Sequence, residues 1–214
     1  MLIVFTKAPV PGRVKTRLMP DLTPGQCSEL QDAFIQDIIS KFSARPDLDI
    51  MICHTPDDTA LYFTRFGVKL FPQGSGEFGE RICRCLNRAV SMGAPKVFLI
   101  GSDIPHLEPV ELEHALEALD SADMVFGPAE DGGYYLVGIK KRVSHAVFME
   151  IPWSSVATLE VTEAKAHALG IRTARLKKYF DIDTFDDLKR LRVRDCMKHT
   201  ARILQRLGIR SEPA

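Results

Sequence analysis

Short apolar runs rich in β-branched residues alternate with amphipathic segments along nearly the whole chain. The runs of strand length are 2–6, 48–55, 68–72, 96–103, 123–129, 134–140 and 171–176. Apolar residues recur at helical spacing in 24–42, 57–65, 77–93, 110–122, 156–169 and 184–207. This alternation predicts an α/β fold with a mainly parallel central sheet.

Local signals sharpen some of these boundaries. Thr23 is a predicted N-cap, and Pro24 suits the first turn of the helix that follows it. The Asp131-Gly132 pair between two apolar runs predicts a β-hairpin. The C-terminal residues 209–214 are expected to fray.

Size and composition limit the class of protein. The chain has 214 residues and 23.9 kDa, enough to bury a hydrophobic core, and we expect one domain over residues 1–214. Lys plus Arg and Asp plus Glu are both 28, and this balance argues against a general nucleic-acid or anionic-membrane binder. The five cysteines lack disulfide-framework or zinc-site spacing, so we expect reduced thiols. The chain shows no signal-peptide shape and no apolar run near the roughly 20 residues of a membrane span, so we expect a cytoplasmic protein.

The segments that follow the predicted strands carry most of the candidate chemistry. In parallel sheets, ligands bind beyond the carboxyl ends of the strands. Five such segments are rich in polar residues and glycine: 7–17, 73–81, 101–106, 127–134 and 177–184. The functional residues are therefore expected in these five segments.

The first of these segments, KAPVPGRVKTR, is basic and contains no acid. Gly12 allows a close backbone approach to phosphate, and the positive charge comes from Lys7, Arg13, Lys15 and Arg17. The segment does not match the P-loop, because no first glycine stands at the required spacing. It is either a phosphate-binding loop or a solvated basic turn.

Three aspartates are candidate ligands for a divalent cation. Asp103 ends the strongest apolar run, where a rigid strand would hold it, and Mg²⁺ prefers oxygen ligands. The alternative for Asp103 is a cap on the following helix. Asp181 and Asp183 share one face of an extended segment, because they are two residues apart. With Asp103 they could form a carboxylate cage for one metal ion.

Two glycine-rich segments have competing interpretations. GSGEFG (74–79) has the GxGxxG pattern of a dinucleotide-binding turn, which would indicate an NAD(P)-dependent oxidoreductase. Against this, Glu77 would repel a pyrophosphate at the helix N-terminus. Asp131, Gly132 and Gly133 form either a simple hairpin turn or an open floor for an acceptor substrate.

Taken together, KAPVPGRVKTRL, PQGSGEFGERI, IGSDIPHL, GPAEDGGYYLVG and FDIDTFDDL resemble a bacterial family of nucleotide-diphospho-sugar-transferase-like proteins. Its members are usually labelled glycosyltransferases, sometimes linked to arsenosugar biosynthesis. Relatives include 2-phospholactate guanylyltransferase and the molybdenum-cofactor nucleotidyltransferases. The resemblance spans nearly the whole chain and implies the GT-A fold. The sequence departs from typical glycosyltransferases of that fold at 103–105, which read DIP instead of DxD and resemble the nucleotidyltransferase branch more closely.

The resemblance also implies roles for individual residues. The donor phosphates would contact the basic loop, at Lys7, Gly12, Arg13, Lys15 and Arg17. The nucleotide would face Gln73, Gly74 and Arg81. The metal ion, Mg²⁺ or Mn²⁺, would be bound by Asp103, with Asp181 or Asp183 as a second ligand. The acceptor would face Asp131, Gly132 and Gly133.

The predicted activity is Mg²⁺-dependent nucleotidyl transfer from a nucleoside triphosphate to a small phosphorylated acceptor. Such transfer depends on positioning and charge neutralisation, and the predicted catalytic residues are Lys15, Arg17, Asp103 and Asp131. One alternative is glycosyl transfer from a nucleotide sugar, for which Asp131 is the candidate base. The others are an oxidoreductase and a non-catalytic nucleotide sensor. A homodimer is one candidate assembly, the oligomeric state is left open by the sequence, and no nucleic-acid or membrane partner is expected.

Overall fold

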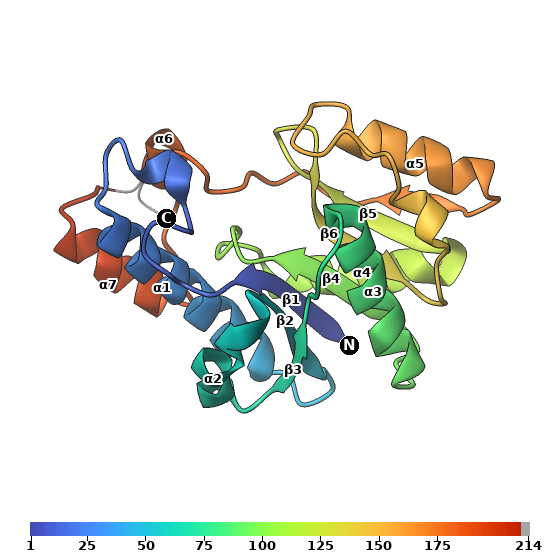
Figure 1. The fold of residues 1–214 in the computed structure, drawn as a ribbon, viewed down its shortest axis with the longest axis horizontal. Coiled ribbons are helices and arrows are strands. Elements are labelled where there is room, and N and C mark those ends of the chain that lie inside the picture. Colours follow the sequence, from blue (N-terminus) through green and yellow to red (C-terminus); the bar gives the residue numbers. More distant parts are fainter. Residues whose placement is uncertain (211–214) are drawn as a thin grey trace.

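A single seven-stranded sheet forms the centre of the protein in the computed structural model, which describes residues 1–210 (Figure 1). The strand order is β3-β2-β1-β4-β6-β5-β7. β6 runs antiparallel to both of its neighbours, and the remaining pairings are parallel. The predicted α/β fold with a mainly parallel sheet is therefore confirmed.

The strands follow the apolar runs of the sequence closely. They are β1 (Leu2–Lys7), β2 (Ile50–Thr55), β3 (Lys69–Pro72), β4 (Val97–Gly101), β5 (Met124–Pro128), β6 (Tyr134–Ile139) and β7 (Thr173–Arg175). β5 and β6 form the expected hairpin. Because β1, β4 and β5 end at the same edge of the sheet, the segments after them meet there.

The helices also follow the predicted pattern. They are α1 (Pro24–Ser43), α2 (Ala60–Phe63), α3 (Phe78–Ser91), α4 (Pro109–Ser121), α5 (Thr158–Ala168), α6 (Phe185–Arg190) and α7 (Lys198–Arg206). Short 3-10 turns are η1 (Thr16–Leu18), η2 (Asp57–Thr59), η3 (Thr64–Phe66) and η4 (His145–Val147). The helix expected over 57–65 is thus divided among η2, α2 and η3. Thr23 caps α1 through a reciprocal capping box with Gln26, and Pro24 begins the helix as predicted.

Apolar clusters cover both faces of the sheet. On one face, β1 residues Leu2 and Val4 pack with side chains of α1 and α4. On the other face, Ile3 packs with side chains of α3 and α5. Successive strand residues point to opposite faces, so β1 is buried on both sides, as is usual for parallel sheets. Full burial of one such side chain contributes about 1.5–3 kcal/mol.

A third apolar cluster holds together a separate lobe, formed by η1, α1, α6 and α7 (Figure 1). Leu18 from η1, Phe34 from α1 and Ile182 are fully buried in it. Asp37 on α1 accepts hydrogen bonds from the backbone N–H groups of His199 and Thr200, at 2.9 and 2.8 Å, and so joins α1 to α7. This lobe fixes the basic loop and the 181–183 segment beside the edge of the sheet.

The remaining general expectations concern cysteines, membrane and tail. All five cysteines are free, as expected. Among residues 1–210, no helix is long and apolar enough to cross a membrane. The predicted fraying at the C-terminus falls partly on 211–214, which lie outside the described residues.

Candidate active site

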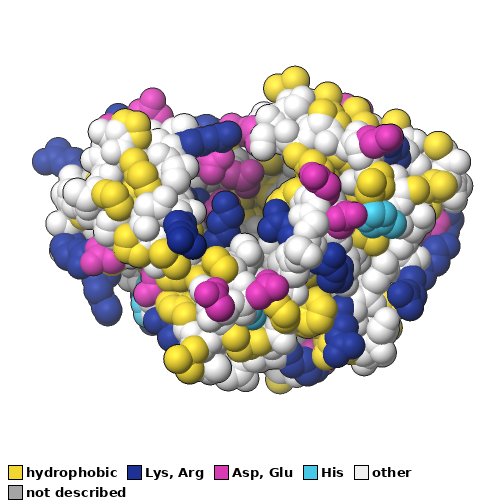
Figure 2. Space-filling view, in the orientation of Figure 1, with side chains coloured by type: hydrophobic (Ala, Val, Ile, Leu, Met, Phe, Trp, Pro, Cys, Tyr) yellow, Lys and Arg dark blue, Asp and Glu magenta, His cyan; other side chains and the backbone are white. Residues whose placement is uncertain are grey.

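A cleft of about 560 Å³ lies at the carboxyl edge of the sheet, between the α1–α6–α7 lobe and the β5–β6–α5 side of the molecule. Figure 2 shows this hollow, with acidic side chains inside it and basic side chains at both its lower and its upper edge. All five segments picked out in the sequence contribute to its walls, through residues in 7–17, 73–81 and 101–103 and through Asp131 and Asp183. The structure therefore has a cleft at the place where the sequence predicted the functional site.

A buried hydrogen-bond network fixes the ends of β1 and β4 under the cleft. The Gln31 amide of α1 donates to the hydroxyls of Thr6 and Ser102, at 3.1 and 2.9 Å. Thr6 in turn donates to Ser102 at 2.9 Å. These three side chains are almost fully buried, so the network is rigid and shielded from water. It positions Lys7 and Asp103, the residues that follow Thr6 and Ser102 in sequence.

Lys15 connects the basic loop to the acidic side of the cleft. Its backbone is left-handed, with φ 49°, and its side chain is only 3% exposed. The ammonium forms an ion pair with Asp103 and donates to the Ile182 carbonyl at 2.6 Å. It also lies 5.0 Å from the centre of the Phe34 ring. Lys15 therefore joins three segments that are far apart in the sequence.

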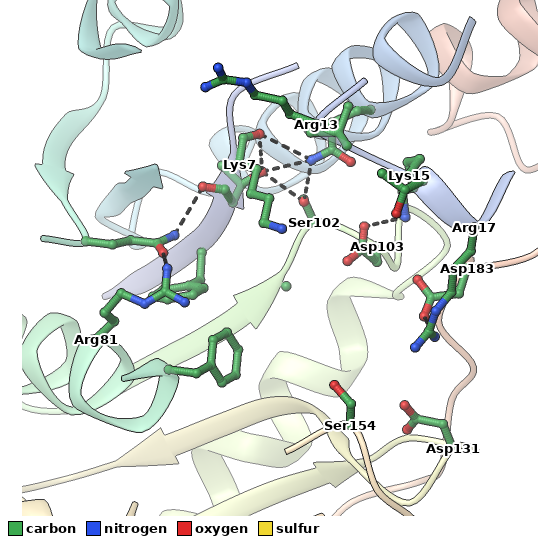
Figure 3. Close-up of a pocket in the computed structure, with 18 of the residues that line it drawn as sticks. Lys7, Arg13, Lys15, Arg17, Arg81, Ser102, Asp103, Asp131, Ser154 and Asp183 are labelled. Atoms are coloured by element: carbon green, nitrogen blue, oxygen red, sulfur yellow. Dashed lines mark hydrogen bonds and ion pairs between the residues drawn. The ribbon is translucent and has the colours of Figure 1, made fainter. Parts of the chain in front are cut away.

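The other cations of the loop are more accessible. Arg17 pairs with Asp183 at 2.8 Å, and both side chains are substantially exposed. Among the described residues, neither Lys7 nor Arg13 takes part in an ion pair with another side chain. Lys7 and Arg13 lie across the cavity from Asp131 (Figure 3). The loop thus presents positive charge that the protein itself does not fully neutralise.

The 73–81 segment is braced from inside. Gln73 is 1% exposed, and its amide donates to the carbonyls of Thr6 and Cys53 while its oxygen accepts from Arg81 at 3.0 Å. Arg84 donates to the Gln73 carbonyl. Gln73 therefore orients Arg81 toward the cleft.

The GSGEFG turn does not form a dinucleotide site. Glu77 and Glu80 form a capping box at the N-terminus of α3, so their carboxylates hold the backbone N–H groups that a pyrophosphate would need. A Cβ on Gly76 would lie 2.1 Å from Glu80, so that side chain fills the space beside the turn. The oxidoreductase alternative loses its physical basis here.

Four carboxylates gather in the cleft and the cavity that adjoins it, two of them in contact with cations of the basic loop. They belong to Asp103, Asp131, Asp181 and Asp183. Burial, and then the charges of the other three acids, raise the pKa of Asp181 to about 7. Burial likewise raises the pKa of Asp183, although the Lys15 charge opposes the shift. The four acids therefore form one electrostatically coupled group, which the sequence only hinted at.

Asp103 and Thr184 have distinct local roles. Asp103 does not cap α4, whose N-cap is Glu108, so its alternative interpretation as a helix cap is wrong. Its backbone carbonyl instead accepts from the Ile182 N–H at 2.9 Å, which ties the β4 end to the 181–183 segment. Thr184 caps α6 in a capping box with Asp187.

Carboxylates are suitable ligands for a hard divalent cation, but these four are not arranged as a metal site. Mg²⁺ and Mn²⁺ favour carboxylate oxygens, and a cation would relieve the repulsion that raises the pKa of Asp181. Within residues 1–210, however, no three His, Cys, Asp or Glu side chains are grouped closely enough to hold a metal ion. Asp103 is paired with Lys15 and Asp183 with Arg17. A cage of Asp103, Asp181 and Asp183 is thus not formed, and metal binding by these acids stays a prediction.

The glycines of the predicted site do not line the cleft as a floor. Gly12 (φ 79°) and Gly74 (φ 74°) shape their turns but are absent from the walls of the cavity. Gly132 has φ 91°, and a Cβ there would lie 2.3 Å from the Val156 Cα, so the 153–156 segment packs directly on it. Gly133 lines a smaller cavity beside the cleft. Gly132 is therefore covered by another segment, whereas Asp131 and Gly133 are open to a cavity.

Several cleft residues were missed by the sequence reasoning. They include Gln31, Ser102, Phe78, Trp153, Ser154 and Val156. The sequence contained one usable signal, because the chain's single tryptophan stands in the short stretch IPWSSV, outside the predicted strands. The remaining predicted residues do meet at the cleft: Lys7, Arg13, Lys15, Arg17, Gln73, Arg81, Asp103, Asp131 and Asp183 line it, and Asp181 lines the adjoining cavity.

Several known proteins with similar sequences or folds carry the names of transferases. The chain is 24% identical to 2-phospho-L-lactate guanylyltransferase of Methanothermobacter thermautotrophicus over 206 residues, which cover 94% of this chain and 88% of the relative. A solved structure from Desulfovibrio desulfuricans G20, inferred to be a nucleotide-diphospho-sugar transferase, is 30% identical with a TM-score of 0.86, covering 97% of this chain and 94% of that one. CMP:2-keto-3-deoxy-manno-octonic acid synthetase, solved with CTP, shares the fold alone, with 12% identity, a TM-score of 0.57, and coverage of 96% and 99%.

These likenesses confirm the GT-A-like fold and the predicted resemblance, and they place the chain among the transferases. A family model matches residues 38–155, which include β4 with Asp103, the DGG turn and Trp153. The chain belongs to the family described as "Uncharacterized protein conserved in bacteria (DUF2064)".

Proposed function

We propose that this protein is a nucleotidyltransferase that moves a nucleotidyl group from a nucleoside triphosphate to a small phosphorylated acceptor. The observation that carries the proposal is the division of the cleft. Cations of the 7–17 loop line the cavity together with Asp103 after β4, which is ion-paired with Lys15, and Asp131 stands across the cavity from Lys7 and Arg13 (Figure 3). The sequence relatives, which include a guanylyltransferase, support the same class of reaction.

The reaction needs no covalent intermediate with the protein. An oxygen of the acceptor phosphate attacks the α-phosphorus of the triphosphate. The bond between that phosphorus and the bridging oxygen of the β-phosphate breaks, and pyrophosphate leaves with the bond electrons. The described cleft residues supply positioning and charge neutralisation, which are the main requirements of such a step.

The basic loop is assigned to the donor phosphates. Lys7 and Arg13 offer charge that no acid of the described chain pairs with, and Lys15 is held rigidly by Phe34 and Ile182. Arg81, held by Gln73, extends the positive surface along the same wall. Charge-assisted contacts from such groups are about twice as strong as neutral hydrogen bonds.

The acids are assigned to a divalent cation and the acceptor side. Asp103, with Asp181 or Asp183, would hold Mg²⁺ or Mn²⁺ once Lys15 turns from Asp103 to a phosphate. Bound there, the ion would neutralise charge on the donor phosphates. Asp131 faces the acceptor.

A second candidate, glycosyl transfer from a nucleotide sugar, is favoured by the position of Asp131. Its carboxylate lines both the cleft and the adjoining cavity, where a base would have to meet an acceptor hydroxyl. The same cations would then stabilise a departing nucleoside diphosphate.

A thermal-shift panel with and without Mg²⁺ tests these proposals. It contains the four ribonucleoside triphosphates, UDP-glucose, GDP-mannose and NAD⁺, on the intact protein and on Asp103→Asn. We expect a triphosphate with Mg²⁺ to stabilise the protein by about 2.7 kcal/mol at 100 times its Kd. In Asp103→Asn, most of this stabilisation should be lost, and the remaining shift in melting temperature should be the same with and without Mg²⁺. Stabilisation by a nucleotide sugar alone would transfer the assignment to glycosyl transfer. Stabilisation by NAD⁺ alone would refute both.

A further inference from the structure

A second cavity of about 170 Å³ adjoins the cleft, and its character is different. Its walls are mostly apolar or aromatic: Phe5, Phe78, Ile82, Leu99, Tyr134, Tyr135 and Trp153. It shares Phe5, Phe78, Gly101, Asp131 and Ser154 with the cleft, so the two spaces are neighbours along a common wall. We call this cavity the aromatic chamber.

The rings of the aromatic chamber hold one another in place. Phe78 meets Phe5 edge to face at 5.7 Å and 88°, and meets Trp153 at 4.8 Å and 78°. Trp153 also meets Tyr134 at 6.2 Å and 67°. Contacts of this geometry stabilise aromatic pairs beyond simple burial, by about 0.5–1.5 kcal/mol each. The chamber is therefore largely preformed.

The segment that carries Trp153 is held in an unusual backbone conformation. Glu150 and Ser154, on either side of it, have φ angles of 52° and 61°. Non-glycine residues rarely adopt such angles, and they persist where surrounding structure enforces them. Two contacts enforce this conformation. Val156 packs on Gly132, and the backbone N–H of Trp153 donates to the Ile151 carbonyl at 2.8 Å. This backbone keeps the indole against Phe78.

Charge separates the aromatic chamber from the phosphate region. No Lys or Arg side chain of the described residues lines it, and its charged members are the acids Asp131 and Asp181 at the cleft side. A triphosphate would therefore be repelled from the chamber, whereas the basic loop attracts it. Phe78 is 39% exposed and lines both cavities, so its ring is accessible to a molecule in the cleft.

We propose that the acceptor carries an aromatic ring or a hydrocarbon group of similar size, which lies in the aromatic chamber while its phosphate reaches into the cleft. This inference rests on the proposed nucleotidyl transfer and specifies the acceptor class. The volume suits one ring, because a cavity of about 150 Å³ lined by apolar side chains is known to bind benzene. A purely polar acceptor would leave the chamber's apolar walls facing trapped water.

The chain offers its own probe, because Trp153 is its single tryptophan. Phenyl phosphate and glycerol 3-phosphate carry the same charged group and differ in the attached ring. With a saturating triphosphate and Mg²⁺, we expect phenyl phosphate to change the Trp153 emission in a saturable way and to bind at least about tenfold more tightly than glycerol 3-phosphate. The triphosphate alone should leave the emission nearly unchanged.

The matched variants are Phe78→Ala and Phe66→Ala. Phe66 lies outside both cavities, where it packs near Tyr62 and Arg65. We expect Phe78→Ala to weaken phenyl phosphate about tenfold and to leave glycerol 3-phosphate unchanged, and Phe66→Ala to change neither. If Phe78→Ala lowers the melting temperature, Phe78→Leu keeps the bulk and removes the ring, and it should weaken phenyl phosphate by several fold.

Two results would overturn the inference. Equal affinity for the two phosphates would show that the chamber does not select a ring. A change in Trp153 emission on adding the triphosphate alone would show that the nucleobase occupies the chamber. Failure of the proposed function has a different signature: no triphosphate stabilises the protein, although phenyl phosphate still binds against Trp153 and loses affinity in Phe78→Ala.

Discussion

The two sides of the cleft differ in charge and also in how the chain builds them. The donor side takes four of its cations from one stretch, residues 7–17, and the fifth from Arg81 on α3. The acceptor side takes its carboxylates from three separate places, at 103, 131 and 181–183. A positive surface can therefore be encoded locally, whereas the coupled acids exist only because the fold brings distant segments together.

Lys15 lies at the boundary between the two sides. Its ammonium pairs directly with Asp103 although it belongs to the basic loop. Each side thus partly neutralises the other in the absence of ligand. A bound triphosphate would compete with Asp103 for Lys15, so the donor would change the electrostatics of the acceptor side as it binds. The predictions below test this division, from the largest expected effect to the smallest.

Lys15→Met should weaken triphosphate binding most. The side chain is 3% exposed, and methionine keeps the apolar stem beside Phe34 while it removes the charge. Loss of a buried charge-assisted contact costs about 2–5 kcal/mol, so we expect a Kd at least about 30-fold weaker. Isothermal titration with the triphosphate selected by the thermal-shift panel measures this. Lys189→Met, which removes an exposed lysine paired with Asp186 on α6, is the control and should bind normally. Equal affinities for the two variants would remove Lys15 from the donor side.

His106 tests how the loop after β4 is held on the acceptor side. Its ring stacks 4.5 Å from Phe180, and both ring nitrogens are buried without a hydrogen-bond partner among the described residues. Burial, and then the Lys41 charge, lower its pKa to about 4. The unfolded state has a pKa of about 6.5 and takes up the proton first, so the stabilising effect of the neutral ring is complete above pH 6.5 and is lost as the pH falls toward 4.

The effect on the free energy of unfolding should reach about 3 kcal/mol at pH 4. His106→Phe fills the same apolar site without a titrating group. Urea unfolding of the protein and of His106→Phe from pH 7.5 to 4 should therefore give curves that diverge below pH 6.5. A matched control is Phe148→Leu, which changes another buried ring without removing a titrating group and should lower stability by the same amount at every pH. Parallel curves for His106→Phe as well would mean that His106 titrates normally.

Arg17→Ala should have a smaller effect on the donor side. Arg17 and Asp183 are 63% and 39% exposed, so solvent and salt screen this pair. We expect the triphosphate Kd to weaken by roughly three- to tenfold, and its dependence on NaCl concentration to become shallower, because one phosphate contact is lost. Titrations from 50 to 300 mM NaCl would check both. An unchanged slope would place Arg17 outside the phosphate contacts.

Much of the fold could be predicted because its signals are local. Apolar runs marked the strands, Thr23 and Pro24 marked the start of α1, and the Asp131-Gly132 pair marked the β5–β6 hairpin. The rule for parallel sheets then placed the functional segments at one edge.

The internal construction of the site could not be predicted in the same way. Gln31 and Ser102 form a hydrogen bond although they are 71 residues apart in the chain. No pattern of apolar and polar residues in the sequence indicates such a contact. Gln73 lines the cleft as expected, but its hydrogen bonds to Arg81 and to the Thr6 carbonyl could not be read from the sequence. Gly132 suggested an open floor because nothing in the sequence showed that Val156 packs on it. These features depend on distances between elements, which only the structure supplies.

Asp131→Asn gives the smallest expected effect and separates the two candidate reactions. The Asp131 Oδ1 accepts from the Gly133 N–H at 2.9 Å, and an amide oxygen can keep that turn contact. If the acceptor carries a phosphate, the carboxylate repels it, so removing one negative charge should tighten phenyl phosphate by about two- to threefold, which corresponds to less than about 1 kcal/mol. The triphosphate Kd should not change.

The control is Glu130→Gln, which alters the neighbouring acid that pairs with Arg190 and lines neither cavity, and it should leave both affinities unchanged. In glycosyl transfer, by contrast, Asp131 would be the base, and its loss would slow turnover of a nucleotide sugar by about 10²- to 10⁴-fold. Tighter binding of phenyl phosphate would therefore show that the acceptor phosphate binds beside the acids of the cleft despite their negative charge. The positive charge needed to neutralise that phosphate would then have to come from a bound cation.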